Sequence, residues 1–389
     1  MRTTTATGRP TADGDVSSTL TNCIVEGSVY GGGYSATLPP VSVMVKTGNK
    51  WFLTPPSYDS NLGAYLEAEL PATESYTWEH VASVTTSNAI ANKKLRTTEN
   101  LDQLGTVMGN VTLTINGDDT KINGSVYGGG EESRVDGSTT VTVDCDGIIG
   151  TEGSGGVEFG NVYGGGKGKS NDPSLGLVKG NTTITISGEP TILHNVYGGG
   201  AFGSVGTFTG YDTTRNFPTG WSAGTGKCQV TINGGTYGTN GHNNGMVFGS
   251  SRGDDTNDNP FSAEDSMLVN KLAWVYETEV VIGDSNPKNT TAPLIRGSLY
   301  GGGENGHVAN NASVTLNKGT IGIESKESTY TDENGVVYKG PEYPYRGNVF
   351  GAGCGTDTYS IDHDDDEDTP NLIYYNPWAG VVLGNTTVT

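Results

Sequence analysis

The residues best suited to enzyme chemistry lie together, where Arg252 is followed by Asp254, Asp255 and Asp258. Glycoside hydrolysis needs two carboxylates held at a defined separation across the bond that is cleaved. Clustered aspartates beside a basic residue could therefore act on a polysaccharide, and Asp255 is the residue that such an enzyme would need. A polar turn explains the same residues equally well, because their spacing does not fix the distance between the carboxylates.

A second acidic group could bind a cation. Asp362, Asp364, Asp366 and Asp368 place hard oxygen ligands at alternate positions, and Ca²⁺ prefers such ligands. The segment lacks the Asp-x-Asp-x-Asp-Gly pattern of a calcium loop, and acidic runs are usually solvated. Calcium binding is thus one hypothesis and a solvated loop is the other.

The histidines and cysteines do not predict a metal centre. The five His residues are scattered, and the four Cys residues show no C-x-x-C spacing. Cys145 and Cys228 fall in line with Ile and Val residues of alternating segments, which predicts that both are buried as small apolar side chains. A disulfide bond stays open as the alternative.

A recurring aromatic residue is the third candidate. It follows a small or polar residue and an aliphatic one, and it precedes glycines, first in Ser-Val-Tyr-Gly-Gly-Gly at 28–33. If the copies stack, their rings form a row that could bind sugar rings, or a row that packs on itself and only stabilises the fold. Two tryptophans outside the repeats are further candidates. The predicted ligand-binding residues are Tyr30, Tyr127, Tyr163, Tyr197, Phe248, Tyr300, Phe350, Trp51 and Trp78.

The glycine triplets do not predict a nucleotide site. They match neither G-x-x-x-x-G-K-[ST] nor a G-x-G-x-x-G that opens a helix. Tight corners that need positive φ explain them better. We therefore expect each triplet to be a corner of the backbone.

A second repeated phrase defines the element before each corner. Residues 105–114, 176–185 and 380–389 align without a gap, and each leads into alternating apolar and Thr residues. Alternation with period two, rich in Val, Ile and Thr, predicts a half-buried strand. The aromatic phrase also alternates, as in Val25, Gly27 and Val29. One unit is then a strand, a turn, a second strand, a glycine corner and a connector of variable length.

Units of this kind cannot bury their apolar faces alone, so we expect them to stack. The fold we expect is all-β, a right-handed parallel β-helix, or β-solenoid, of irregular repeats of about 35–50 residues. A kelch-like β-propeller is the alternative, but the 34 residues from Tyr163 to Tyr197 hardly hold a four-stranded blade. The predicted organisation is a tail and first repeat at 1–33, an inserted loop or subdomain at 34–104 with a possible helix after Ala89, and solenoid repeats at 105–389.

Charge and hydropathy limit the classes of partner that the chain could bind. The chain has 22 Lys and Arg against 43 Asp and Glu, a net charge of −21, which disfavours nucleic acid. No run of about 18 apolar residues predicts a membrane span, and no signal peptide is visible. Thr389 falls within a strand phrase that the aligned copies continue, so we expect a piece of a longer chain whose export and anchoring signals lie outside it.

In the style of these phrases, the chain resembles the Gly-rich β-helix repeat regions of large bacterial surface and adhesin-like proteins. The resemblance covers most of 105–353 and the first unit. It implies a non-catalytic structural scaffold, extracellular or at the cell surface, whose loops bind a glycan or a host or cell-surface protein. The insertion at 34–104 is the first choice for that surface. A polysaccharide-active β-helix enzyme, either a hydrolase or a lyase, is the second hypothesis.

Overall fold

The computed structural model describes residues 14–34, 105–152, 159–170, 172–239, 244–254, 270–285, 291–323, 335–337, 346–356 and 378–389, together with the backbone of several strands between them. Every regular element in this part of the chain is a β-strand. The prediction of an all-β chain is therefore confirmed.

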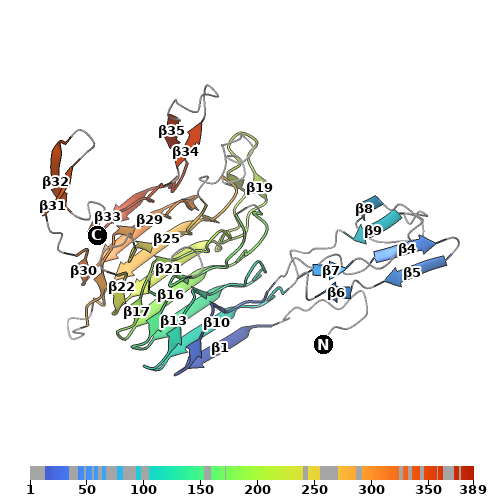
Figure 1. The fold of residues 1–389 in the computed structure, drawn as a ribbon, viewed down its shortest axis with the longest axis horizontal. Helices are drawn as coiled ribbons and strands as arrows, with labels where there is room; N and C mark the ends of the chain where they lie inside the picture. Colours follow the sequence, from blue (N-terminus) through green and yellow to red (C-terminus); the bar gives the residue numbers. More distant parts are fainter. Residues whose placement is uncertain are drawn as a thin grey trace.

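Three parallel sheets make up the body of the molecule (Figure 1). The first sheet contains β1 (Val16–Thr21), β10 (Val111–Asn116), β13 (Thr139–Asp144), β16 (Thr182–Ser187), β21 (Lys227–Ile232), β25 (Glu277–Ile282), β29 (Ala312–Leu316) and β36 (Thr386–Val388). The second contains β2 (Ile24–Val25), β11 (Lys121–Ile122), β14 (Ile148–Ile149), β17 (Thr191–Ile192), β22 (Thr236–Tyr237), β26 (Leu294–Ile295) and β30 (Thr320–Ile321). The third contains β3 (Val29–Tyr30), β12 (Val126–Tyr127), β15 (Val162–Tyr163), β18 (Val196–Tyr197), β23 (Val247–Phe248), β27 (Leu299–Tyr300) and β33 (Val349–Phe350).

Each repeat gives one strand to each sheet, and we call one such repeat a coil. Equivalent residues pair between neighbouring coils, as Leu113 does with Val141 and Val141 with Ile184. Stacking in register is compatible with a β-solenoid. It does not fit a propeller, because propeller blades are four-stranded antiparallel sheets.

The predicted second strand of the unit is two short strands. β11 and β12 are separated by a bend at 123–125, where the sequence alternation predicts a continuous strand. The bend brings Gly124 against the preceding coil, where a Cβ on Gly124 would lie 2.6 Å from the carbonyl carbon of Gly27. The alternation of apolar residues therefore predicts correctly which side chains point inward, but it does not predict the bend at 123–125.

The inward side chains form one continuous apolar core. Because side chains alternate along a strand, the Val, Ile and Leu residues of all three sheets point to the same interior. Cys145 and Cys228 are buried, and all four cysteines are free thiols, which confirms the prediction for these two. A smaller apolar cluster lies beside the start of the first sheet. It contains Val107, Val111, Val135, Val178, Val205, Cys228, Val275 and Val308.

The glycine triplets are corners, but the predicted reason is wrong. Gly128, Gly129 and Gly130 do not have positive φ. A Cβ on Gly129 would instead lie 2.7 Å from the backbone nitrogen and 2.8 Å from the Cα of Gly166. The corners therefore need glycine because the backbones of successive coils pass too close for a side chain.

The remaining strands lie in connectors. Within 34–104, β5 (Lys50–Thr54), β4 (Val43–Thr47), β9 (Lys93–Thr97) and β8 (Thr77–Val81) form a sheet in that order, and β6 (Ser57–Asp59) pairs with β7 (Ala64–Leu66). β9 occupies the segment where a helix was suggested, which corrects that expectation. The other pairs are β19 (Gly210–Tyr211) with β20 (Pro218–Thr219), β24 (Trp274–Val275) with β28 (His307–Val308), β31 (Glu327–Thr331) with β32 (Val337–Pro341), and β34 (Thr358–Ile361) with β35 (Leu372–Tyr375).

Candidate functional site

The recurring aromatic residues form one column of stacked rings along the third sheet. Neighbouring ring centroids lie 4.7–5.0 Å apart, with interplanar angles of 6–15°. This spacing follows from the distance between paired strands. The column contains Tyr30, Tyr127, Tyr163, Tyr197, Phe248, Tyr300 and Phe350, and we call it the aromatic column.

Most of the aromatic column is buried, so it has the second of the two predicted arrangements, a row that packs on itself. Tyr127, Tyr163, Tyr197 and Phe248 are at most 2% exposed. Both faces of each of these rings are covered by the neighbouring rings, and connector residues such as Phe202 pack against the column. A sugar ring could not stack on them in this arrangement. Their observed role is packing within the column.

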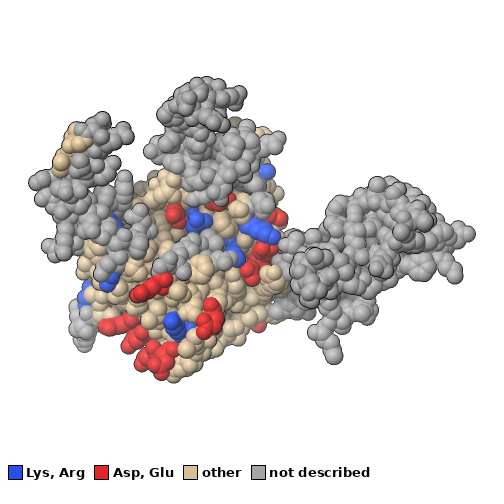
Figure 2. Space-filling model, in the orientation of Figure 1, with Lys and Arg blue, Asp and Glu red and all other residues tan. Residues whose placement is uncertain are grey.

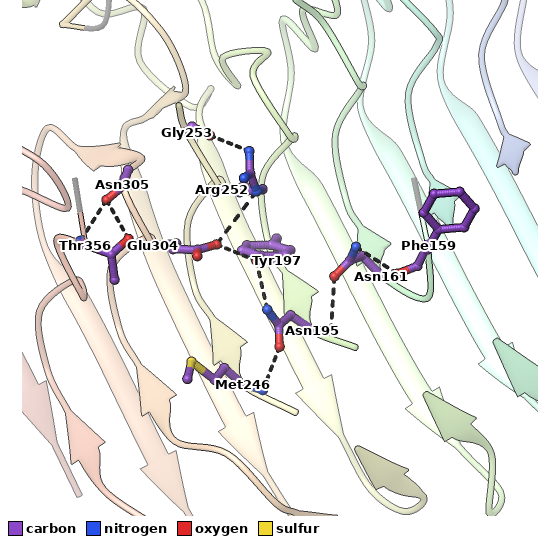
Figure 3. Close-up of polar contacts among 10 residues, drawn as sticks. All are labelled: Phe159, Asn161, Asn195, Tyr197, Met246, Arg252, Gly253, Glu304, Asn305 and Thr356. Atoms are coloured by element: carbon purple, nitrogen blue, oxygen red, sulfur yellow. Dashed lines mark hydrogen bonds and ion pairs between the residues drawn. The ribbon is translucent and has the colours of Figure 1, made fainter. Parts of the chain in front are cut away.

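A polar cluster lies at the edge of the aromatic column (Figure 3). The hydroxyl of Tyr197 donates to Oε2 of Glu304 at 2.6 Å and accepts from Nδ2 of Asn195 at 3.0 Å. Nε of Arg252 lies 3.9 Å from the same carboxylate oxygen. The hydroxyl of Tyr163, also buried, has no hydrogen-bond partner among the described residues.

Electrostatics keep these hydroxyls neutral. Burial, followed by the negative charge of Glu304, raises the pKa of Tyr197 well above its usual value. Burial also raises the pKa of Tyr163, and Arg252 opposes that shift. A phenol that holds its proton this firmly can donate a hydrogen bond, but it is a poor general base or nucleophile near neutral pH. The cluster is therefore suited to joining coils.

Only part of the predicted carboxylate group lies among the described residues. Arg252 pairs with Glu304 and donates from Nη1 to the carbonyl of Gly253 at 3.2 Å. Asp254 is described, whereas Asp255 and Asp258 lie outside the described residues. The sequence analysis missed Glu304. Reading the residue after each glycine triplet as a column would have found it.

That column places opposite charges on neighbouring coils. Nζ of Lys167 lies 3.0 Å from Oε1 of Glu131, one coil apart, in the same relation as Arg252 and Glu304. Acidic and basic side chains also lie near one another on the face drawn in Figure 2, between broad uncharged areas. Ion pairs of this kind at the surface contribute little each, so their main effect is on register.

A ladder of polar side chains runs beside the column. At five positions a backbone N–H donates to a side-chain oxygen of the coil before it, and the series is interrupted at Met246, which has no side-chain oxygen. Asn195 donates to Oδ1 of Asn161 at 3.1 Å, and Met246 donates to Oδ1 of Asn195 at 2.9 Å (Figure 3). Ser28, Ser125 and Ser298 accept in the same way, at 3.0–3.1 Å. The ladder satisfies buried backbone donors at the bends.

The connector at 206–226 carries a second group of aromatic side chains. Phe208 lies 5.3 Å from Tyr211 and 5.0 Å from Trp221, and Trp221 lies 5.5 Å from Tyr276, measured between ring centroids. All four are half-buried. We call Phe208, Tyr211, Trp221 and Tyr276 the connector cluster. Tilted rings with partly exposed edges could contact the apolar face of a sugar.

Hydrogen bonds hold the part of the connector around Tyr211 and Asp212. The carboxylate of Asp212 accepts from the backbone N–H groups of Thr214 at 2.9 Å and Arg215 at 2.6 Å, and these bonds lower the pKa of Asp212. The Tyr211 hydroxyl donates to the carbonyl of Lys271, and burial raises the pKa of Tyr211 to about 12. A loop fixed in advance loses less entropy when it binds.

The other predicted site residues cannot be placed as a site. Asp362, Asp364, Asp366 and Asp368 lie outside the described residues, so calcium stays a hypothesis. Trp51 and Trp78 lie in β5 and β8, and their side chains are outside the described part as well. Within the described ranges, no three His, Cys, Asp or Glu residues are arranged to hold a metal ion.

Two further findings concern the chain as a whole. In the part of the chain that the structure describes, no helix is long and apolar enough to cross a membrane. A comparison with protein-family models, with curated proteins and with solved structures finds no significant match.

Proposed function

We propose that this chain is a right-handed parallel β-helix that serves as a non-catalytic scaffold outside the cell, and that its connectors bind glycans. The observation that carries the proposal is the combination of a regular stack with a rigid aromatic connector. The resemblance to surface and adhesin-like repeat regions supports the extracellular setting, as does the acidic composition.

The stack supplies the rigidity that a display scaffold needs. Equivalent residues pair from coil to coil, and the aromatic column and polar ladder tie the same coils together. Connectors leave this frame at the glycine corners and vary in length. Recognition usually lies in such loops, because they tolerate sequence change while the frame holds them in place.

The connector cluster is the binding surface we propose among the described residues. Tyr and Trp give a large, rigid contact area at low entropic cost. Lys227 and Glu279 lie on the outer face of β21 and β25, next to the connector, and form an ion pair of 2.7 Å. Their charged groups could bind sugar hydroxyls. The insertion at 34–104 stays the second proposed surface, and its deletion tests it.

Incubation with a panel of acidic and neutral polysaccharides tests the function. We expect saturable binding by isothermal titration calorimetry and no release of reducing ends. Tyr276→Ala should weaken binding by about tenfold, the loss expected for one aromatic contact. Tyr34→Ala is the matched control, because Tyr34 is an aromatic side chain outside the connector cluster that is 63% exposed.

Two results would contradict the proposal. Release of reducing ends that disappears in Asp255→Asn would favour the polysaccharide-active enzyme. Binding that Tyr276→Ala and Tyr34→Ala weaken equally would exclude the connector cluster as the specific surface. Circular dichroism of each variant shows whether the fold is kept.

A further inference from the structure

The hairpin of β19 and β20 carries a cation in its loop. Arg215 lies between the two strands, and its side chain is 48% exposed. Its Cζ lies 4.7 Å from the ring centroid of Phe217 and 5.8 Å from that of Trp378. Aromatic faces attract a guanidinium group and can hold its plane, while the N–H groups at its edge stay able to bind a ligand.

A second cation lies beside the connector cluster. Nζ of Lys271 is 5.5 Å from the ring centroid of Tyr211, a member of that cluster. Two hydrogen bonds hold the segment of Lys271 against the hairpin. The Tyr211 hydroxyl donates to the carbonyl of Lys271 at 3.4 Å, and Nδ2 of Asn270 donates to the carbonyl of Arg215 at 3.0 Å. The two cations therefore belong to segments that contact each other.

These two cations are paired less closely than other basic side chains of the stack. Lys271 forms no salt bridge among the described residues, and Nε of Arg215 lies 4.0 Å from Oδ2 of Asp212. The terminal nitrogens of Arg215 have no hydrogen-bond partner in the described part of the chain. Salt bridges of 2.7–3.0 Å engage Arg134, Lys167, Lys169, Lys179 and Lys227.

The carboxylates near the hairpin are occupied by local donors. Asp212 accepts from three backbone N–H groups of its own turn at 2.6–3.3 Å. The negative charge of Asp172 contributes, after burial, to the raised pKa of Tyr211, and Oδ1 of Asp172 accepts from the N–H and the hydroxyl of Ser174 at 2.9 and 2.6 Å. The two cations are therefore left able to bind an external anion.

We propose that the glycan bound at the connector cluster is acidic, and that its carboxylate or sulfate group pairs with Arg215 and Lys271. This inference rests on the proposed function and names its ligand class. The rings of the cluster contact the apolar face of the sugar. The planar guanidinium of Arg215 offers paired N–H donors to two oxygens of the anionic group, and Lys271 adds a point charge.

The net charge of −21 opposes such a ligand only at long range. At physiological ionic strength, charges on the surface are screened beyond about 8 Å, so the carboxylates of distant coils act weakly on the bound sugar. Arg215 and Lys271 act at contact distance. The local arrangement therefore decides the preference.

Isothermal titration calorimetry in about 0.15 M NaCl tests the inference with two matched pairs of polysaccharides. Polygalacturonate is compared with its methyl ester, and dextran sulfate with dextran, because the members of each pair share a backbone and differ in charge. We expect the acidic member of at least one pair to bind about tenfold more tightly, the effect of one charge-assisted hydrogen bond. The pair that shows the preference identifies the group as carboxylate or sulfate.

Substitutions assign the preference to the two cations. Arg215→Gln should weaken binding of the acidic member about tenfold and leave the neutral member unchanged, and Lys271→Gln should weaken the acidic member about threefold. Lys121→Gln is the matched control, because Lys121 is an exposed cation on β11 and its loss changes the net charge equally. Tyr276→Ala should weaken both members alike, since it removes a ring and no charge.

The outcomes separate this inference from the function on which it rests. Equal binding within both pairs, binding confined to neutral polysaccharides, or a preference that Lys121→Gln reduces as much as Arg215→Gln would overturn the inference and leave the proposed function. Absence of binding to every polysaccharide would overturn both. If Arg215→Gln also weakens the neutral member, Lys271→Gln decides, because it leaves the stack of Arg215 on Phe217 in place.

Discussion

Two sides of the same coils show opposite outcomes of repetition. On the third sheet, the outward residues are the rings of the aromatic column, and Tyr163 is 0% exposed. On the first sheet, the outward residues of β10, β13 and β16 are mainly threonines, such as Thr112, Thr140 and Thr142, and they stay half-exposed or exposed. Both sides are regular columns, yet one is core and the other is surface.

The difference lies in what covers each side. Connectors leave at the glycine corners, directly after the third-sheet strands, and residues such as Ala201, Phe202 and Cys354 pack against the rings. No connector among the described residues packs on the outward threonines of β10, β13 and β16, so these side chains stay in contact with solvent. A repeated side chain therefore becomes a column in either case, and the route of the connector decides whether that column is buried.

Truncation of a ring should separate the two sides most clearly. Tyr163→Ala removes a buried ring held between Tyr127 at 4.7 Å and Tyr197 at 4.8 Å, so it should lower the free energy of unfolding by about 3–5 kcal/mol. Thr142→Ala, its control on the open face of the neighbouring sheet, should change it by less than about 0.5 kcal/mol. Urea unfolding followed by circular dichroism measures both. Similar losses would show that the two sides do not differ in this way.

The glycine corner should give the next largest effect. Gly129→Ala forces a Cβ against the backbone of Gly166, and overpacking of this kind costs about 1–3 kcal/mol. Gly27→Ala is the control, because a Cβ there meets no atom within 4 Å. Neither glycine has positive φ, so steric contact alone distinguishes them. Equal melting temperatures for the two variants would contradict the close-approach explanation.

Much of the fold follows from the sequence because it depends on local pattern. The alternation in 111–116 and its aligned copies predicts inward Val and Ile residues and outward Thr residues, and β10, β13 and β16 have that arrangement. The reason for the glycine corners did not follow. Close approach of two backbones is set by the neighbouring coil, whereas the sequence of one corner indicates only that side chains are absent.

The candidate site was predicted less well, because it depends on contacts between coils. Tyr197 and Glu304 are 107 residues apart, and only the stacking of the coils brings them together. The connector cluster was missed for a similar reason, since Tyr276 joins Trp221 from the next coil. The sequence identifies which residues share a column, but it does not show which side chains cross from one coil to another.

The hydroxyls of Tyr197 and Tyr163, both in the buried aromatic column, give the smallest and most specific test. Tyr197→Phe leaves the Glu304 carboxylate and Nδ2 of Asn195 without a shared partner, so it should cost about 1–2 kcal/mol. Tyr163→Phe removes a buried hydroxyl that has no partner among the described residues, so it should be neutral or stabilising by up to about 1 kcal/mol. Both are measured by urea unfolding at pH 8. Losses of equal size would show that the two hydroxyls are equivalent.

The stability of the protein at alkaline pH tests whether the hydroxyl of Tyr163 is buried. Burial raises the pKa of Tyr163 in the folded chain, whereas the unfolded chain keeps a value of about 10. Below pH 10 both states hold the proton and this tyrosine adds no pH dependence. Above it the unfolded chain releases the proton first, so the free energy of unfolding falls, with a slope that approaches about 1.4 kcal/mol per pH unit for each such tyrosine once the unfolded chain is fully ionised. Tyr163→Phe should therefore remove about 1 kcal/mol of the loss between pH 10 and 11, where the tyrosine of the unfolded chain is only partly ionised, and Thr142→Ala should leave the loss unchanged. An unchanged slope in Tyr163→Phe would mean that this hydroxyl reaches solvent, and the covered side would then be open at this position.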